Sequence, residues 1–321
     1  MRRAGAGRWL GALPGLRGRL CILIYHRVLE RADPFLPGDP DRETFEWQMR
    51  ALRRHFRPLD LGQALDLLAA GSLPPGAVAV TFDDGYADNH TVALPILRRY
   101  GVPATFFVAT GFLDGGRMWN DAIIESIRRT HKDALDLEAV GLGRCEIRTL
   151  EQRLDLIARL IRRVKHQRPA VRGQAVERIV TAAGAKLPDD LMMTSEQVRG
   201  LQAAGMGIGA HTHTHPILAA TELAEVRGEL ALGRKRLEAL TDREVTLFAY
   251  PNGRPRLDYR SEHVAEVRAA GFRYAVSTAR GAASQGSDPL QLPRFTTWDR
   301  SPARFVARVL SSYRSAREER V

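Results

Sequence analysis

Cysteine is nearly absent from this 321-residue sequence, and its scarcity excludes two kinds of site. Cys21 and Cys145 are too few for a disulfide framework, and no Cys-x-x-Cys spacing exists for a cysteine-bound zinc ion. A reducing compartment is therefore modestly favoured, because small oxidised domains usually depend on several disulfides.

Long apolar runs are also missing. The apolar run at residues 20–25 is too short for a signal-peptide core, and no segment approaches the ~20 apolar residues of a membrane span. A basic tail over residues 1–19 carries an Arg/Trp/Leu stretch, but its glycines and Pro14 favour a floppy tail over an amphipathic helix. We therefore expect a cytoplasmic protein, with weak peripheral association at the anionic inner membrane face as the open alternative.

The net charge is +11, yet the positive residues form no long run. Arginine pairs are scattered, as at 98–99, 128–129 and 162–163, without interleaved aromatic residues. Such a pattern is typical of solvated helix faces, so we expect no nucleic-acid partner; a nucleic-acid binder would instead show steeply salt-dependent affinity.

Short apolar runs rich in strand-forming residues recur along the chain. Because they are apolar almost throughout, they predict strands buried on both faces, as in a parallel sheet covered by helices. The predicted strands are residues 21–25, 77–82, 104–108, 206–210, 245–249, 274–277 and 291–295. Seven strands suit an incomplete or irregular barrel.

Helical patterns alternate with these strands, which predicts an α/β fold. The predicted helices are residues 44–55, 89–100, 195–204, 222–240 and 261–270, and glycine follows three of them directly. Residues 121–190 break the alternation with an almost wholly helical pattern, which we interpret as a helical insertion beside the barrel mouth. We therefore expect one domain over residues 20–321, containing this insertion.

The first chemically capable cluster is Thr81-Phe82-Asp83-Asp84-Gly85, at the carboxyl end of a predicted buried strand. Neighbouring carboxylates at a strand end point in opposite directions, so they can take separate tasks. In a parallel barrel, catalytic residues gather at this end of the strands. An Asp-Gly turn is the purely structural alternative for this cluster alone.

The second cluster is His211-Thr212-His213-Thr214-His215, directly after the predicted strand 206–210. Three histidines in five residues are improbable as core filling, and imidazoles are favoured ligands of zinc and its neighbours. A carboxylate and two imidazoles leave a metal an open position for catalysis, and a second carboxylate can act as general base. We expect a divalent metal, zinc first, with cobalt or nickel as alternatives.

The two clusters, in this order, resemble motifs of the polysaccharide deacetylase family, which is carbohydrate esterase family four or the nodulation-deacetylase homology domain. Residues 81–85 match its Thr-Phe-Asp-Asp-Gly motif in full, and residues 211–215 match its His-Ser/Thr-x-x-His motif. The resemblance covers roughly residues 20–296 outside the insertion. It implies the family's irregular (β/α)7 barrel.

The resemblance also implies roles for individual residues. Asp83 would be the general base, while Asp84, His211 and His215 would hold the metal. His213 falls at a non-ligand position of the same loop, and the neighbouring threonine would brace that loop through hydrogen bonds.

Three motifs depart from the family pattern. At 248–253, Ala249 stands where the family's third motif has arginine, although the backbone N–H of Asn252 could still face a developing oxyanion. The fourth motif's Asp and Trp have no clear match near residues 274–278. The fifth motif, Leu-x-His, appears as Leu-Pro-Arg at 292–294, without the histidine that should be the general acid.

Other residues can fill these gaps. His26 follows Tyr25 at the end of the first strand, as in a family branch akin to the biofilm poly-N-acetylglucosamine deacetylases, and is our candidate general acid; a structural histidine is the alternative. Arg294 is a candidate replacement for the arginine beside Asp83. Trp119 could wall the sugar site or pack in the core.

These features predict a metal-dependent hydrolase that removes N-acetyl groups from an N-acetylhexosamine in a glycan or lipid-linked saccharide, so the expected partner is a carbohydrate substrate. One alternative is a hydrolase of the same fold that acts on another amide, such as a cyclic imide or ureide. The other is a carbohydrate-binding protein with impaired catalysis, which the departures favour and the intact metal set opposes.

Overall fold

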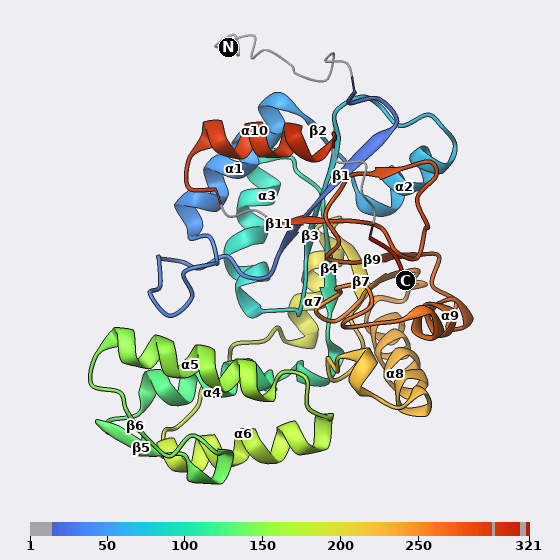
Figure 1. Cartoon of the computed structure of the whole chain (residues 1–321). Coiled ribbons are helices and arrows are strands. Elements are labelled where there is room, and N and C mark those ends of the chain that lie inside the picture. The colour runs from blue at the N-terminus through green and yellow to red at the C-terminus, as the bar shows by residue number, and fades with distance from the viewer. Residues whose placement is uncertain (1–14, 297–298, 315–318) are drawn as a thin grey trace.

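The computed structural model describes residues 15–296, 299–314 and 319–321, and it shows an α/β fold built on one curled sheet (Figure 1). The main sheet has nine strands in the order β10-β1-β3-β4-β7-β8-β9, with β11 pairing β1 and β2 pairing β3. Its strands are β1 Arg19–Tyr25, β2 Arg57–Pro58, β3 Ala77–Phe82, β4 Ala104–Val108, β7 Gly207–Ala210, β8 Leu247–Ala249, β9 Tyr274–Val276, β10 Ala283–Ser284 and β11 Phe295–Thr296. The predicted distorted barrel is confirmed.

The strands of the barrel centre are buried on both faces, as their composition predicts. Every residue of β3 and β4 is buried, and both strands pair in parallel with their neighbours. The last predicted strand, 291–295, joins the two edges of the curled sheet: Leu292 bridges Val276 of β9, and Phe295 pairs with Leu23 of β1. The carboxyl ends of the parallel strands therefore surround one site.

Helices pack outside the sheet, and all five predicted ones are present. Four have boundaries shifted by at most two residues, whereas the predicted helix 89–100 begins with five residues of π-helix. Their bounds are α1 Arg42–His55, α2 Leu61–Ala69, α3 Leu94–Tyr100, α4 Trp119–Arg129, α5 Leu150–Val164, α6 Pro169–Ala183, α7 Ser195–Ala203, α8 Leu223–Thr241, α9 Ser261–Ala269 and α10 Pro302–Ser312. A π-helical turn, η2 (Asn89–Ala93), leads into α3, which ends at Gly101 in the left-handed conformation (φ 60°).

The insertion forms its own layer of α4, α5 and α6, drawn in green below the sheet in Figure 1. The sequence pattern of residues 121–190 predicted helices and gave no sign of a strand, yet β5 (Ala134–Asp136) and β6 (Arg144–Glu146) form an antiparallel hairpin there. Leu135 and Cys145 of this hairpin are buried in the apolar core of the insertion. Three-residue strands are too short to show the alternation by which a strand is recognised in sequence.

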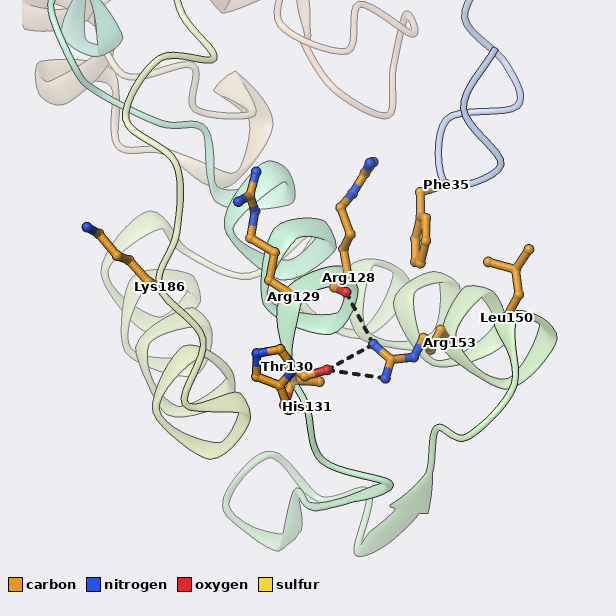
Figure 2. Close-up of a pocket in the computed structure, with 8 residues that line it drawn as sticks. All are labelled: Phe35, Arg128, Arg129, Thr130, His131, Leu150, Arg153 and Lys186. Atoms are coloured by element: carbon orange, nitrogen blue, oxygen red, sulfur yellow. Dashed lines mark hydrogen bonds between the residues drawn. The ribbon is translucent and has the colours of Figure 1, made fainter. Parts of the chain in front are cut away.

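Arg153 of α5 fastens the insertion's helices together (Figure 2). Its guanidinium donates hydrogen bonds to the carbonyl oxygens of Arg128 and Thr130 at the end of α4, over 3.2–3.3 Å. These carbonyls have no partner within their own helix, so a cation placed there satisfies them and opposes the negative end of the helix dipole.

In the part of the chain that the structure describes, no helix combines the length and apolar character needed to cross a bilayer. The basic tail expected over residues 1–19 lies outside the described residues as far as residue 14, so its conformation stays a prediction.

Candidate active site

The two carboxylates of the first cluster lie on a tight turn at the end of β3. Asp84 and Gly85 both adopt positive φ (76° and 92°), and the N–H of Gly85 donates to the carbonyl of Asp83 over 3.0 Å. This turn directs the two carboxylates to different partners. The Asp-Gly turn expected as the structural alternative is therefore present together with the arrangement expected for function. Glycine suits position 85 because that φ disfavours side chains and a Cβ there would lie 3.0 Å from Val108.

Asp83 forms a two-pronged ion pair with Arg294. The guanidinium donates to Oδ1 over 2.7 Å and to Oδ2 over 2.6 Å, and both side chains are buried. Burial is the largest influence and would raise the pKa of Asp83, but the positive charges of Arg294 and His211 and the hydrogen bonds from Arg294 together hold that pKa below its usual range. The arginine that the third motif lacks at Ala249 is thus supplied from a different part of the chain.

The histidine loop is held by local hydrogen bonds and by unusual backbone angles. Thr212 and His215 both have positive φ (64° and 53°), and the N–H of His215 donates to the Thr212 hydroxyl over 3.1 Å. The ring of His213 turns away from this loop's centre, with Nδ1 bonded to the Thr110 hydroxyl over 2.9 Å. Thr212 therefore braces the loop, and His213 does not join the other two rings.

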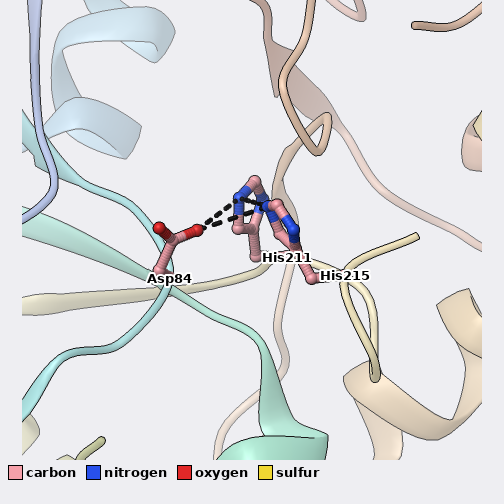
Figure 3. Close-up of side chains that lie close together, drawn as sticks. All are labelled: Asp84, His211 and His215. Carbon is pink, nitrogen blue, oxygen red and sulfur yellow. Dashed lines mark hydrogen bonds and ion pairs between the residues drawn. The ribbon is translucent and has the colours of Figure 1, made fainter. Parts of the chain in front are cut away.

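Asp84, His211 and His215 converge on one point (Figure 3). Asp84 Oδ1 lies 3.3 Å from the Nε2 atom of each histidine, and those two nitrogens lie 3.1 Å apart. All three residues are buried. Nδ1 of His211 donates to the carbonyl of Ala249 over 2.7 Å, which leaves its Nε2 lone pair directed at the cluster.

The electrostatics of this cluster show how closely the three groups are coupled. Burial lowers the pKa of His215 to about 3, against the attraction of Asp84. The pKa of His211 is raised, because the charge of Asp83 and the hydrogen bond to Asp84 outweigh burial. The pKa of Asp84 is lowered by the histidines in spite of burial. Asp84 is therefore an ionised carboxylate at neutral pH and can act as a metal ligand.

The spacing of these donors fits a divalent metal ion. Ligand atoms about 2.0–2.2 Å from a metal lie about 3.0–3.5 Å from one another, and the three donor atoms are 3.1–3.3 Å apart. One carboxylate and two imidazoles suit zinc and neighbouring transition metals, and three protein ligands leave room for substrate. The donor set is consistent with a divalent metal and does not identify which one.

A cavity of about 250 Å³ opens over these donors. Its walls come from both the barrel and the insertion: His26, Asp83, Asp84, Met118, Trp119, Asn120, Ile161, Lys165, His211, His215, Asn252 and Thr278. His26 is half-buried, and Asn252 sits in the left-handed conformation (φ 59°) on the loop after β8. The structure thus brings His26, Asn252, the candidate general base and the candidate metal ligands to one cavity, with Arg294 paired to Asp83.

Comparison with known proteins agrees with this geometry. The sequence matches the family described as polysaccharide deacetylase over residues 70–141 and 169–275, which is more than half of the chain. The chain belongs to the polysaccharide deacetylase family. A relative, YxkH of Bacillus subtilis (strain 168), whose name provisionally assigns it to the same family, is 23% identical over 278 residues, or 86% of this chain and 70% of its own.

Solved structures share the fold of this deacetylase. The deacetylase PplD of Streptococcus pyogenes, in complex with acetate, superposes with a TM-score of 0.60 at 19% identity, over 90% of this chain and 97% of its own. IcaB from Ammonifex degensii superposes with a TM-score of 0.59 at 20% identity, over 92% and 97%. The family and fold predicted from two motifs are therefore confirmed.

Two features of the deacetylase site had no signal in the sequence. Glu229 of α8 accepts hydrogen bonds from the N–H groups of His213 and Thr214 over 2.8 and 2.6 Å, and so ties down the histidine loop. Tyr86 donates its hydroxyl proton to the buried carboxylate of Asp121 over 3.0–3.2 Å. In sequence, a carboxylate on a helix cannot be told from a solvent-exposed one until the segment that it contacts is known.

Proposed function

We propose that this polysaccharide deacetylase hydrolyses the N-acetyl group of an N-acetylhexosamine unit in a glycan or a lipid-linked saccharide, with zinc as its first-choice metal. The observation that carries the proposal is the pairing of a buried, ionised Asp83 with a three-donor metal set in one 250 Å³ cavity. A divalent metal held by Asp84, His211 and His215 would supply Lewis acidity, which polarises an amide carbonyl and acidifies water.

Asp83 is the proposed general base. Arg294 occupies one lone pair on each carboxylate oxygen, so each oxygen can still accept a proton from the attacking water. Arg294 keeps the carboxylate ionised and fixes its direction, which makes it a positioning residue. Its charge also limits the basicity of Asp83, so the proton transfer depends on a strongly acidified water.

His26 is the proposed donor of the proton that the leaving amine requires. It lies at the end of β1 and lines the same cavity as Asp83 and Asp84. The carbonyl oxygen of His26 accepts a hydrogen bond from Asn89 over 2.8 Å, which holds its backbone in place. The N–H of Asn252, on the loop opposite, is the proposed donor to the oxyanion.

The deciding experiment measures acetate released from N-acetylglucosamine oligomers by the purified protein. We expect acetate to vanish with a chelator, to return with added zinc, cobalt or nickel, and to fall about 10²–10⁴-fold in Asp83→Asn, as removal of a general base predicts. His26→Gln should slow release with a changed pH profile, whereas His131→Gln, an exposed histidine of the insertion, should not.

Absence of acetate from every oligomer, with metal demonstrably bound, would overturn this proposal. Release of product from a cyclic imide or ureide instead would identify the enzyme as a hydrolase of another amide. Oligosaccharide binding without hydrolysis of any amide would identify a carbohydrate-binding protein.

A further inference from the structure

Arg172 of α6 is a buried arginine without an ion-pair partner among the described residues. Its side chain is buried, with 5% of the residue's surface exposed, and among the described residues no carboxylate lies within ion-pair distance of it. Its guanidinium makes one long hydrogen bond, to the carbonyl of Lys165 over 3.4 Å, and lies over the Trp119 ring, 4.9 Å from the centroid. Most of its N–H donors are therefore free for another acceptor.

Neighbouring arginines of the insertion show the contrast. In the basic pocket of Figure 2, Arg128 pairs with Asp33 and Glu125, and Arg129 pairs with Glu125. Both cations already have carboxylate partners within the protein. Burying an unpaired guanidinium is costly, and the face of an indole ring offsets only part of that cost. An anion bound beside Arg172 would therefore offset the cost of burying its unpaired charge.

Arg172 lies close to the deacetylase site. It lines a second cavity of about 820 Å³, which shares Met118 and Trp119 with the cavity over the metal donors. Trp119 stands between the two cavities.

Lys165 adds a second cation from the same insertion. It lies at the end of α5, is half-buried, lines the cavity over the metal donors, and forms no ion pair among the described residues. It belongs to residues 142–168, the stretch that falls between the two segments matching the family. The wider cavity also holds Arg117 and a single carboxylate, Glu177, so its charge stays positive.

We propose that Lys165 and Arg172 form a subsite for an anionic group of the substrate, a carboxylate or phosphate attached to the saccharide beside its acetylated unit, with Trp119 as the surface on which a sugar ring stacks. This inference rests on the proposed deacetylase function. A guanidinium fork and an ammonium are both suited to oxyanions, and a cavity that restricts water strengthens the attraction.

The test compares a hyaluronan tetrasaccharide, which alternates glucuronate with N-acetylglucosamine, with neutral chitotetraose. In Asp83→Asn protein, where hydrolysis is greatly slowed, calorimetry should show at least about tenfold tighter binding of the anionic oligomer, equivalent to about 1.4 kcal/mol. Lys165→Met and Arg172→Met should each remove most of that preference and leave chitotetraose within about twofold. N-acetylglucosamine 1-phosphate, tested likewise, distinguishes phosphate from carboxylate recognition by which ligand loses more affinity in the variants.

Arg162→Met is the matched control, because it removes one positive charge from an exposed position of α5 outside the cavity lining. It should leave both affinities unchanged, whereas a general charge effect would reproduce the loss and overturn the subsite. If Arg172→Met fails to fold, Lys165→Met and Arg172→Lys, which retains the positive charge, still test the anionic subsite.

The two proposals fail differently. Acetate released from chitotetraose, with no dependence of anionic binding on Lys165 or Arg172, would overturn the subsite and leave the deacetylase function intact. Binding of the anionic oligomer that depends on both cations, with no acetate released by the metal-loaded wild-type protein, would overturn the function and leave the subsite.

Discussion

Asp83 and Arg294 are separated by 211 residues in sequence and form a buried, two-pronged ion pair. Arg294 also donates to the Thr81 hydroxyl over 3.2 Å and to the carbonyl of Ser277 over 2.9 Å, so its guanidinium is held by four hydrogen bonds. A lysine could not reproduce this fork, because an ammonium is a point charge. The pair therefore orients the Asp83 carboxylate, and loss of either partner would leave a buried charge unpaired.

The first residue-scale prediction concerns the stability of that pair. Arg294→Met should lower the free energy of unfolding by about 3–5 kcal/mol, because it leaves the Asp83 carboxylate buried and unpaired. Urea unfolding in a chelating buffer measures this. In Asp83→Asn/Arg294→Met the loss should be smaller than the sum of the two single losses, since no charge is then left unpaired. Strict additivity would show that the two groups do not interact energetically.

Asp121 gives a prediction about pH. Burial raises its pKa to about 7, and the charge of Arg27 and the hydrogen bond from Tyr86 offset this only in part. The folded pKa lies above the unfolded value of ~3.9, so the stabilising contribution is complete below about pH 4 and is lost as the pH rises through about 7. The wild type should lose about 2–3 kcal/mol relative to Asp121→Asn between pH 5 and pH 8.

Urea unfolding of chelated protein across this pH range gives the difference directly. Asp190→Asn, at an exposed position of the same insertion, is the control and should track the wild type at every pH. A difference between wild type and Asp121→Asn that stays constant from pH 5 to pH 8 would mean that Asp121 titrates normally.

At the scale of elements, α8 supports the histidine loop through a glycine. A Cβ built at Gly233, in the middle of this helix, would lie 2.8 Å from the carbonyl oxygen of Thr212. Glycine costs a helix interior about 1 kcal/mol relative to alanine, so its presence here needs a packing reason. The close approach of the loop backbone supplies that reason, and Glu229 ties the same loop from the same helix.

Gly233→Ala should therefore weaken metal binding by displacing the loop that carries His211 and His215. We expect at least about a tenfold loss in metal affinity, the lower end of what disturbed support of metal ligands produces. Gly228→Ala is the matched control on α8, because nothing lies within 4 Å of a Cβ there. It should raise stability by up to about 1 kcal/mol and leave metal affinity unchanged. Equal metal affinities in both variants would contradict this account of Gly233.

At the scale of the whole molecule, metal binding should stabilise the fold, because the ligands come from the ends of two different strands. Metal at a hundred times its Kd should add about 2.7 kcal/mol to the free energy of unfolding and raise Tm accordingly. His215→Ala should abolish this rise, whereas His213→Ala, on the same loop but outside the donor set, should retain it. A rise that persists in His215→Ala would place the metal elsewhere.

The sequence by itself pointed to the barrel and to the candidate metal ligands, because both depend on local patterns. Residues 77–82 and 104–108 are apolar throughout, which requires burial on both faces, and the runs 81–85 and 211–215 carry their chemistry within five residues each. The hairpin of β5 and β6 was missed because three-residue strands leave too short a pattern.

Only the tertiary structure decided which distant residues complete the site. Arg294 was a candidate partner of Asp83 from the sequence, but it reaches Asp83 only because the segment 291–296 joins the two edges of the curled sheet, a placement that strand pairing sets. The packing of the insertion's helices likewise brings Lys165 to the cavity over the candidate metal ligands and Arg172 to the adjoining wider cavity. Long-range contacts depend on how the elements pack, and no short window of sequence contains that information.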